Sequence, residues 1–393
     1  MPHSALLFQP QTAELGPEWQ ELGSSGYWST LTNIEDEVAF ARAVDSLQGH
    51  NDALRMPADF LATRRKKYLD DRSGKSNFEE AEDQAQVIFE QLTVPHRLTL
   101  VTGSPGAAKT TVAAHWVKLA RAYNSYLPII LITAEKEALL RMQEKMGEAV
   151  PDMTLTLDEA IRQEKPWPKY ACIMIDEAGL IDTKSMAVLL AHAVDAQAAR
   201  VILIGDDKQL LPNGAGQPFR WLRENKKAQL IELLNSYRQK TPFLREAIRD
   251  FYSGDAAAAL NRIVPSFLMA DNILPTLERK LHEVNAEKTL VIVHGPDDLR
   301  QSIAGIIPGL RVFGLAEAQG LAFDHVLFIV SSKIDLAAML VGCSRQRFAL
   351  DVYVDEKTYA NRSELLRDLA QWQRTLMALD ILSAANLSQI IDQ

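Results

Sequence analysis

Short apolar runs and longer amphipathic stretches alternate along the chain from Phe78 onward. Apolar runs of strand length occur first at Leu98–Val101, Ile129–Thr133, Cys172–Ile175 and Val201–Ile204. A second set lies at Leu290–Val293, Leu310–Phe313, Val326–Val330 and Asp351–Val354. Between the runs, apolar residues recur at helical spacing, as in Glu79–Leu92 and Lys109–Tyr123. Apolar strands that alternate with helices are typical of parallel sheets covered by helices on both faces.

The pattern predicts two α/β units in tandem, with helical extensions at both ends of the chain. We expect an N-terminal accessory region at 1–78, a first α/β domain at 79–229, a second at 230–358 and a C-terminal helical segment at 359–393. One helix is predicted in the N-terminal region, at Ile34–Leu47. The closing segment Ser363–Ile391 is also predicted to be helical, with apolar residues along one side at Leu366, Leu369, Trp372 and Leu376.

Composition narrows the class of protein. Of the 393 residues, 47% are hydrophobic and 24% are charged, as in an ordinary globular chain, which excludes a disordered or fibrous protein. The two cysteines, Cys172 and Cys343, exclude a disulfide scaffold and a zinc cluster. The apolar runs are far shorter than a membrane span, and Met1–Pro10 lacks the features of a secretory signal. We therefore expect a cytoplasmic protein with no membrane partner.

The charge balance is acidic, with 42 basic residues against 51 acidic ones and a formal net charge of −9. A chain that grips a phosphate backbone non-specifically usually has a basic balance. Binding to nucleic acid would therefore need a local groove made by particular residues. The basic run Arg64–Lys67 is one candidate, although a short run of charge on a helix is more often a solvated face.

The segment Gly103–Thr110 has the spacing of a phosphate-binding loop, and it lies between a predicted strand and a predicted helix. Its glycines allow backbone N–H groups to curl around a phosphate, and the helix N-terminus adds its positive end. Lys109 would neutralise the β- and γ-phosphates, and the Thr110 hydroxyl would bind Mg²⁺. The loop departs from the usual pattern at Ala108, where a glycine normally precedes the lysine. A methyl group is tolerated there if the helix has already begun and φ is negative. The segment predicts a site for ATP and Mg²⁺.

Two further strand ends carry side chains suited to nucleotide hydrolysis. Asp176 and Glu177 follow the strand Cys172–Ile175, and ligands of parallel sheets bind beyond the carboxyl ends of the strands. Asp176 suits a water-mediated contact to Mg²⁺, and Glu177 suits positioning and deprotonating the attacking water. Gln209 follows the next strand, where its amide can contact both the γ-phosphate and that water. An apolar strand followed by Asp-Glu is common by itself, but together with the upstream loop it favours a catalytic site.

The order of these motifs resembles that of superfamily 1 helicases, specifically the RecD/Dda-like branch. The resemblance covers roughly Glu79–Val354, and its best-matched block is Ile175–Leu222. The other segments that are similar to the family's motifs are, in chain order, Glu82–Val87, Ile132–Ala134 with Glu137, Ala138 and Gly147, Thr154–Ile161, Ser236–Gln239, Gln319-Gly320 with Phe323 and Asp324, and Val341–Arg347. A set of motifs in the right order is far more specific than any one of them.

The resemblance implies two tandem RecA-like P-loop NTPase domains with ATP bound between them. Tyr237 would stack on adenine, while Arg238 and Arg345 would reach the γ-phosphate as it leaves. The catalytic residues expected from the residues and the resemblance together are Lys109, Asp176, Glu177, Gln209, Arg238 and Arg345. The expected nucleotide contacts are Gln84, Gly103, Ser104, Pro105, Gly106, Ala107, Ala108, Lys109, Thr110, Thr111, Tyr237 and Gly320, with Thr110 and Asp176 for the metal.

The strand-binding motifs depart from the family more than the ATP motifs do. The segment Ile132–Ala134 resembles the first of the family's motifs that bind the nucleic-acid strand. Glu135 stands where that motif usually has a proline, and a glutamate close to a phosphodiester would repel it. The segment around Gln319-Gly320 resembles the family's motif V, which usually carries threonine, histidine and lysine before Gln-Gly and an acid after it. This chain has Gly314, Ala316, Glu317 and Ala322 at those positions. The ATP face is therefore better preserved than the nucleic-acid face.

Two functions stay open. The first is an ATP-driven motor that translocates on single-stranded nucleic acid, with DNA favoured over RNA by the form of motif VI at Val341–Arg345. Unwinding of duplexes is uncertain, because few residues separate Ile161 from Cys172, where relatives insert a strand-separating pin. The alternative is a degenerate helicase-like ATPase switch or scaffold that controls a protein partner, which the N-terminal region would dock. The ordered motifs favour the motor, whereas the acidic charge and the altered motif V favour the switch.

Overall fold

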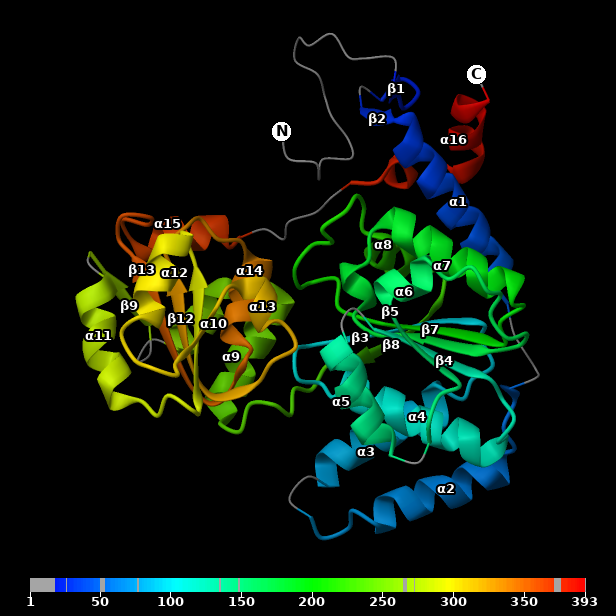
Figure 1. Cartoon of the computed structure of the whole chain (residues 1–393), viewed down its shortest axis with the longest axis horizontal. Coiled ribbons are helices and arrows are strands. Elements are labelled where there is room, and N and C mark those ends of the chain that lie inside the picture. Colours follow the sequence, from blue (N-terminus) through cyan, green and yellow to red (C-terminus); the bar gives the residue numbers. More distant parts are fainter. Residues whose placement is uncertain are drawn as a thin grey trace.

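The computed structural model describes residues 18–25, 27–49, 54–75, 78–133, 136–147, 149–263, 267–271, 273–370 and 376–392. Two α/β lobes lie side by side, and elements from both ends of the chain meet against the first lobe (Figure 1). Each lobe is built on a sheet whose described strands are all parallel. The predicted fold class, two tandem α/β domains of the RecA-like kind with helical extensions, is confirmed.

The first lobe has a sheet that is covered on both faces. Its described strands run in the order β5 (Met153–Thr156), β4 (Ile129–Thr133), β6 (Cys172–Ile175), β7 (Arg200–Ile204), β3 (Leu98–Gly103) and β8 (Gln229–Leu233). The helices α3 (Phe78–Gln86), α4 (Lys109–Tyr123) and α5 (Lys136–Met146) cover one face, and α6 (Leu157–Ile161), α7 (Thr183–Asp195) and α8 (Pro218–Glu224) cover the other (Figure 1). Along β4, Ile129 and Leu131 pack under α4 and α5, while Ile130 and Ile132 pack under α7. Both faces are buried, which explains the continuous apolar runs in the sequence.

The second lobe repeats this arrangement. Its described strands run in the order β11 (Arg311–Phe313), β10 (Thr289–His294), β12 (Phe323–Val330), β13 (Gln346–Asp355) and β9 (Phe267–Ala270). One face is covered by α9 (Pro242–Ser253), α10 (Ala256–Arg262), α13 (Leu315–Ala318), α14 (Leu336–Cys343) and α15 (Arg362–Asp368), and the other by α11 (Ile273–Glu283) and α12 (Asp297–Ala304). All four strands predicted for this lobe are present.

Three strands that the apolar pattern does not predict lie at sheet edges. These are β5 and β8 in the first sheet and β9 in the second. Every side chain of β5 is partly exposed, and β8 alternates between exposed and buried positions. An edge strand has a neighbour on one side only and less cover on its faces, so it lacks the unbroken apolar run that marks a central strand.

The N-terminal region contributes α1 (Leu31–Leu47), in agreement with the predicted helix, and α2 (Ala58–Asp70). The antiparallel pair β1 (Trp19–Glu21) and β2 (Trp28–Thr30) precedes α1. Helix α1 packs against α7, and α2 lies alongside α3 (Figure 1). The basic run Arg64–Lys67 lies on α2, where Arg65 pairs with Glu90 at 3.2 Å and Lys66 and Lys67 are exposed. None of the helices described is long and apolar enough to cross a membrane.

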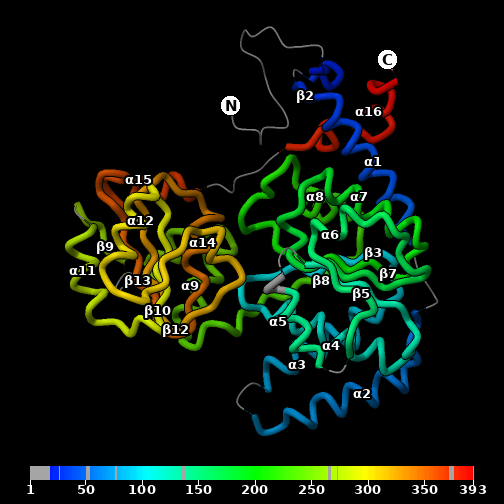
Figure 2. The backbone as a smooth tube through the Cα atoms, viewed as in Figure 1, coloured from blue at the N-terminus to red at the C-terminus, as the bar shows by residue number. Residues whose placement is uncertain are grey.

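The prediction of a helix throughout Ser363–Ile391 is wrong. Helix α15 ends at Asp368, and the chain then forms a short 3-10 turn at Ala378–Asp380 and the helix α16 (Ala384–Ile391), which packs against α1. Leu369 is buried in the core of the second lobe, whereas Met377 is buried in that of the first. Helix α15 accordingly lies on the second lobe, and α16 lies beside α1 (Figure 2). The segment passes from one lobe to the other, so a single amphipathic helix cannot satisfy both cores. Trp372 lies outside the described residues.

Candidate nucleotide site

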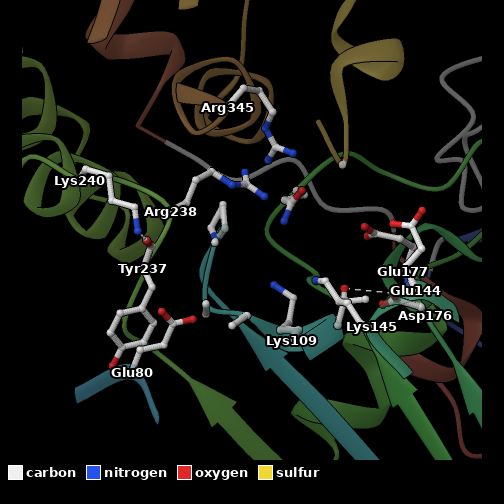
Figure 3. Close-up of a pocket in the computed structure, with 17 residues that line it drawn as sticks. Glu80, Lys109, Glu144, Lys145, Asp176, Glu177, Tyr237, Arg238, Lys240 and Arg345 are labelled. Atoms are coloured by element: carbon white, nitrogen blue, oxygen red, sulfur yellow. Dashed lines mark hydrogen bonds between the residues drawn. The ribbon is translucent and has the colours of Figure 1, made fainter. Parts of the chain in front are cut away.

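A cleft of about 470 Å³ lies where the two lobes meet, at the carboxyl end of the first sheet. The phosphate-binding loop and α5 form its first-lobe wall, and residues that follow β8 and α14 form the opposite wall (Figure 3). The expected site residues that line it are Pro105, Gly106, Ala107, Ala108, Lys109, Thr110, Asp176, Glu177, Gln209, Tyr237, Arg238, Gly320 and Arg345. The fold therefore brings most of the expected site into one cleft.

The lysine of the phosphate-binding loop is held by the loop itself. Strand β3 ends at Gly103 and α4 begins at Lys109, as the sequence predicts. The Lys109 ammonium group donates hydrogen bonds to the Gly103 carbonyl at 2.6 Å and the Ser104 carbonyl at 3.3 Å. It also lies 3.9 Å from the Asp206 carboxylate. Gly103 and Ser104 thus contact the site through their carbonyls and do not line the cleft.

The condition under which a methyl group at 108 would be tolerated without strain, a negative φ, is not met. Ala108 has φ 61° and ψ 25°, a left-handed conformation that costs a residue with a Cβ about 1–2 kcal/mol. Its carbonyl accepts hydrogen bonds from the N–H groups of Thr111 at 2.9 Å and Val112 at 3.0 Å, so the first turn of α4 holds it in place. Glu177, across the cleft, also has a positive φ of 55°. Strained backbone at two positions of one cleft is a common feature of functional sites.

The segment that links β8 of the first lobe to α9 of the second crosses directly over the phosphate-binding loop. Gly106 has φ 84°, and a Cβ on it would lie 2.5 Å from the Arg238 Cβ and 2.6 Å from the Ser236 Oγ. Ser236 Oγ donates to the Pro105 carbonyl at 2.7 Å, and the Tyr237 N–H donates to the Gly106 carbonyl at 3.0 Å. Only glycine permits this approach, because any side chain at 106 would collide with the crossing segment.

The same segment is tied to the second lobe at its other end. The Arg238 guanidinium and the Gln239 amide both donate to the Ser344 carbonyl, at 2.9 Å and 3.2 Å. Residues 236–239 therefore connect the phosphate-binding loop with the turn that carries Arg345. A change in the spacing of the two lobes would strain these hydrogen bonds.

Two carboxyl groups face the loop, Asp176 buried and Glu177 half-buried. Asp176 accepts a hydrogen bond from the Thr110 hydroxyl at 3.2 Å and another from the Glu177 N–H at 3.0 Å. Burial raises the pKa of Asp176, and Lys109 acts in the opposite direction. Burial, and secondly the neighbouring Asp176, raises the pKa of Glu177. A hydroxyl and a carboxylate oxygen are hard ligands of the kind that Mg²⁺ prefers, so the two predicted metal residues fit that ion.

The amide of Gln209 has a defined orientation. Its Nε2 donates to the Asp206 carboxylate at 2.7 Å, and Asp206 is the group that lies near Lys109. Asp206 also accepts a hydrogen bond from the Lys208 N–H at 3.0 Å. Gln209 therefore lines the cleft with its amide nitrogen turned toward Asp206.

Two arginines lie close together on the second-lobe side of the cleft, Arg345 buried and Arg238 half-buried (Figure 3). Arg345 is 2% exposed, and it donates to the Val341 carbonyl at 3.1 Å and the Ser344 hydroxyl at 2.8 Å. Burial, and secondly the charge of Arg238, lowers the pKa of Arg345 to about 9. Burial lowers the pKa of Arg238 to about 10, with Glu177 acting in the opposite direction. Two desolvated cations beside a cleft favour an anion between them.

Gln84, which the resemblance implies would read the adenine base, is placed differently from the other expected contacts. Gln84 is buried and does not line the cleft, because its Oε1 accepts from the Tyr68 hydroxyl at 2.6 Å and its Nε2 donates to Glu80 at 2.9 Å. Glu80 stands at the cleft instead, near Tyr237, whose hydroxyl donates to Asp83 (Figure 3). Whether Gln84 reads a base stays a prediction.

The structure adds four residues that the sequence reasoning does not select. Glu80, Glu144, Lys145 and Lys240 all line the cleft. Thr111, which is expected there, does not line it, and its hydroxyl accepts a hydrogen bond from Lys145 at 3.1 Å. No sequence signal distinguishes these charged residues from others on solvated helices, because the side of α5 that meets the cleft depends on how the helix packs.

A strand, a glycine-containing loop and a helix that begins with Lys109, facing Asp176 at the end of β6 two strands away, define a P-loop NTPase. A family model described as an AAA domain matches residues 79–264. The chain is 26% identical over 284 residues to the conjugal transfer protein TraA of Rhizobium radiobacter. This alignment covers 70% of this chain and 24% of TraA. It is 32% identical over 185 residues to the ATP-dependent RecD2 DNA helicase of Deinococcus radiodurans. That alignment covers 45% of this chain and 24% of RecD2.

These matches and the ordered motifs confirm the predicted resemblance: the chain is similar to RecD-like superfamily 1 helicases, which are P-loop NTPases. The chain spans about a quarter of the length of these two relatives. Among solved structures, Bacteroides Pif1 bound to single-stranded DNA aligns with a TM-score of 0.47 at 12% identity, covering 73% of this chain and 95% of the Pif1 chain.

Proposed function

We propose that the chain hydrolyses ATP in the cleft between its lobes, with Mg²⁺, and uses the hydrolysis to move along single-stranded nucleic acid, DNA in preference to RNA. The observation that carries this proposal is that Lys109 and Glu177 of the first lobe share one cleft with Arg238 and Arg345 of the second. The name of RecD2, a DNA helicase, favours DNA as the track.

Each residue has a separate task in the proposed reaction. Lys109 leaves the loop carbonyls to bind the β- and γ-phosphates. Glu177 orients the attacking water and takes its proton, and Gln209 senses the γ-phosphate through its amide. Thr110 and Asp176 would hold Mg²⁺, directly or through water, and the bound ion would neutralise charge on the β- and γ-phosphates.

The arginines make hydrolysis depend on the spacing of the lobes. Arg238 and Arg345 stabilise the charge that develops on the γ-phosphate only when both lobes grip the nucleotide. Loss of the γ-phosphate removes the anion that offsets these two cations, so the closed arrangement becomes less favourable. The connection through residues 236–239 then carries the change to the second lobe. Alternate closing and opening would move the lobes along a strand.

A second function, a switch that controls a protein partner, is favoured by an exposed acidic side chain in the segment that resembles motif V. Glu317 is exposed, pairs with Arg300 at 2.9 Å and accepts a hydrogen bond from the Gly314 N–H at 2.7 Å. The acid is therefore fixed at a place where the family usually has a base. A negative charge there repels a phosphodiester backbone.

The test is ATP hydrolysis with and without single-stranded DNA, and then RNA, at low salt. Lys109→Ala is the control and is expected to abolish hydrolysis. Strong stimulation by DNA supports the motor, and stimulation by RNA alone would reverse the choice of track. Hydrolysis that is indifferent to both polymers would support the switch. If the wild-type chain neither binds nor hydrolyses ATP, the proposed function is wrong.

A further inference from the structure

Two lysines that line the cleft, Lys145 and Lys240, have no part in the mechanism above, and Lys145 is the one on the first lobe. Lys145 lies in the last turn of α5 and lines the cleft together with Glu144. Its ammonium group donates to the Thr111 hydroxyl at 3.1 Å, one residue beyond Thr110 of the expected metal site. Helix α5 packs against α4, so the first turn of α4 and the last turn of α5 meet at this point.

The position of Lys145 along the cleft indicates which part of a nucleotide it can reach. Lys145 lies with Asp176 and Glu144 at the end of the cleft that is away from Tyr237 and Glu80 (Figure 3). The resemblance places the adenine base at Tyr237, so the opposite end belongs to the phosphates. The charge of Lys145 also acts on the Asp176 carboxyl, in the direction that lowers its pKa, which agrees with this placement.

The charge balance of the cleft gives Lys145 an electrostatic role. Among the described residues that line the cleft, four are acidic and five are basic, and the basic ones are Lys109, Lys145, Arg238, Lys240 and Arg345. Without Lys145 the two signs would be equal in number. A triphosphate with one Mg²⁺ carries a net charge of about −2, so a cleft with no excess of cations would hold it poorly.

We propose that Lys145 is a second phosphate-binding lysine, which contacts the phosphate oxygens of the bound nucleotide from the end of α5. The proposal rests on the proposed function, because it takes ATP as the ligand. Lys109 binds the phosphates from the loop and the two arginines bind them from the second lobe. Lys145 completes the enclosure from a third side. An ammonium–phosphate contact is charge-assisted, and its loss is expected to weaken binding by roughly tenfold or more.

The experiment compares four proteins: the wild type, Lys145→Ala, Lys145→Arg and Lys118→Ala. Lys118 is an exposed lysine on α4 and serves as the matched control for the loss of one positive charge. The dissociation constants of ATP and of inorganic tripolyphosphate are measured for each protein. Tripolyphosphate has no base, so it reports the phosphate end of the cleft alone.

We expect Lys145→Ala to weaken both ligands roughly tenfold, Lys145→Arg to keep most of the affinity, and Lys118→Ala to match the wild type. Unchanged affinity in Lys145→Ala, or an equal loss in Lys118→Ala, would overturn the assignment. A lower unfolding temperature with unchanged affinity would also overturn it, because the lysine would then only hold α5 to α4. These outcomes leave the proposed function intact, whereas a wild type that binds neither ligand overturns both proposals.

Discussion

The carboxyl group of Glu37 makes the contact between the two ends of the chain sensitive to pH. Glu37 lies on α1 and is 1% exposed, and its two oxygens accept the N–H groups of Ala378 at 2.9 Å and Leu379 at 2.7 Å. Burial raises its pKa from 4.5 to about 7, against the two backbone hydrogen bonds, and the nearby Asp380 adds to the rise.

The sign of the effect follows from proton binding. Between pH 4.5 and about 7 the folded state keeps the proton on Glu37, while the unfolded chain has released it. The folded state therefore binds more protons in this window, and the free energy of unfolding falls as the pH rises through it. The displacement of the pKa corresponds to roughly 3 kcal/mol, fully present below pH 4.5 and lost by about pH 7.

The assay is hydrogen exchange at the amides of Ala378 and Leu379, corrected for their intrinsic rates, from pH 4.5 to 8. In the wild type we expect the free energy of local opening to fall by roughly 3 kcal/mol across this range. In Glu37→Gln it should stay nearly constant, because the isosteric amide can still accept a hydrogen bond and has no proton to lose. Glu35→Gln, at an exposed position of the same helix, is the control. Equal pH slopes in the wild type and Glu37→Gln would refute the reasoning.

Three substitutions in the cleft test the assigned roles. Glu177→Gln should keep ATP binding and slow turnover by about 10²–10⁴-fold, as loss of a general base does; a filter-binding assay that shows lost binding would contradict the role of base. Arg345→Ala should slow hydrolysis by about 10³-fold or more, and a wild-type rate in a steady-state assay would place Arg345 outside the reaction. Ala108→Gly should raise the free energy of unfolding by up to about 1 kcal/mol, because relief of the left-handed strain exceeds the gain in unfolded-state entropy. A drop in the unfolding temperature would argue against a positive φ at 108.

Local sequence determined the central strands and the phosphate-binding loop. Leu98–Val101 and Ile129–Thr133 are strands whose two faces are both buried, so their positions are almost all apolar, with Thr99 and Thr133 the buried exceptions. The loop that ends at Lys109 is recognisable because backbone contacts to a phosphate need a fixed spacing of glycine, lysine and hydroxyl. The edge strand β5 was not predicted, because its positions are partly exposed and need not be apolar.

Only the tertiary structure decided which charged residues share the cleft and where the chain ends lie. Arg238 and Lys145 meet the phosphate-binding loop because of how the second lobe and α5 pack, and packing depends on contacts between residues that are distant in the chain. The conformation of Ala108 is local but was also visible only in the structure, since the first turn of α4 holds a φ that the alanine side chain disfavours. Glu37 shows the same principle as the cleft residues: its sequence is that of an ordinary helix, and its burial beneath Ala378 comes entirely from the return of the C-terminal segment to the first lobe.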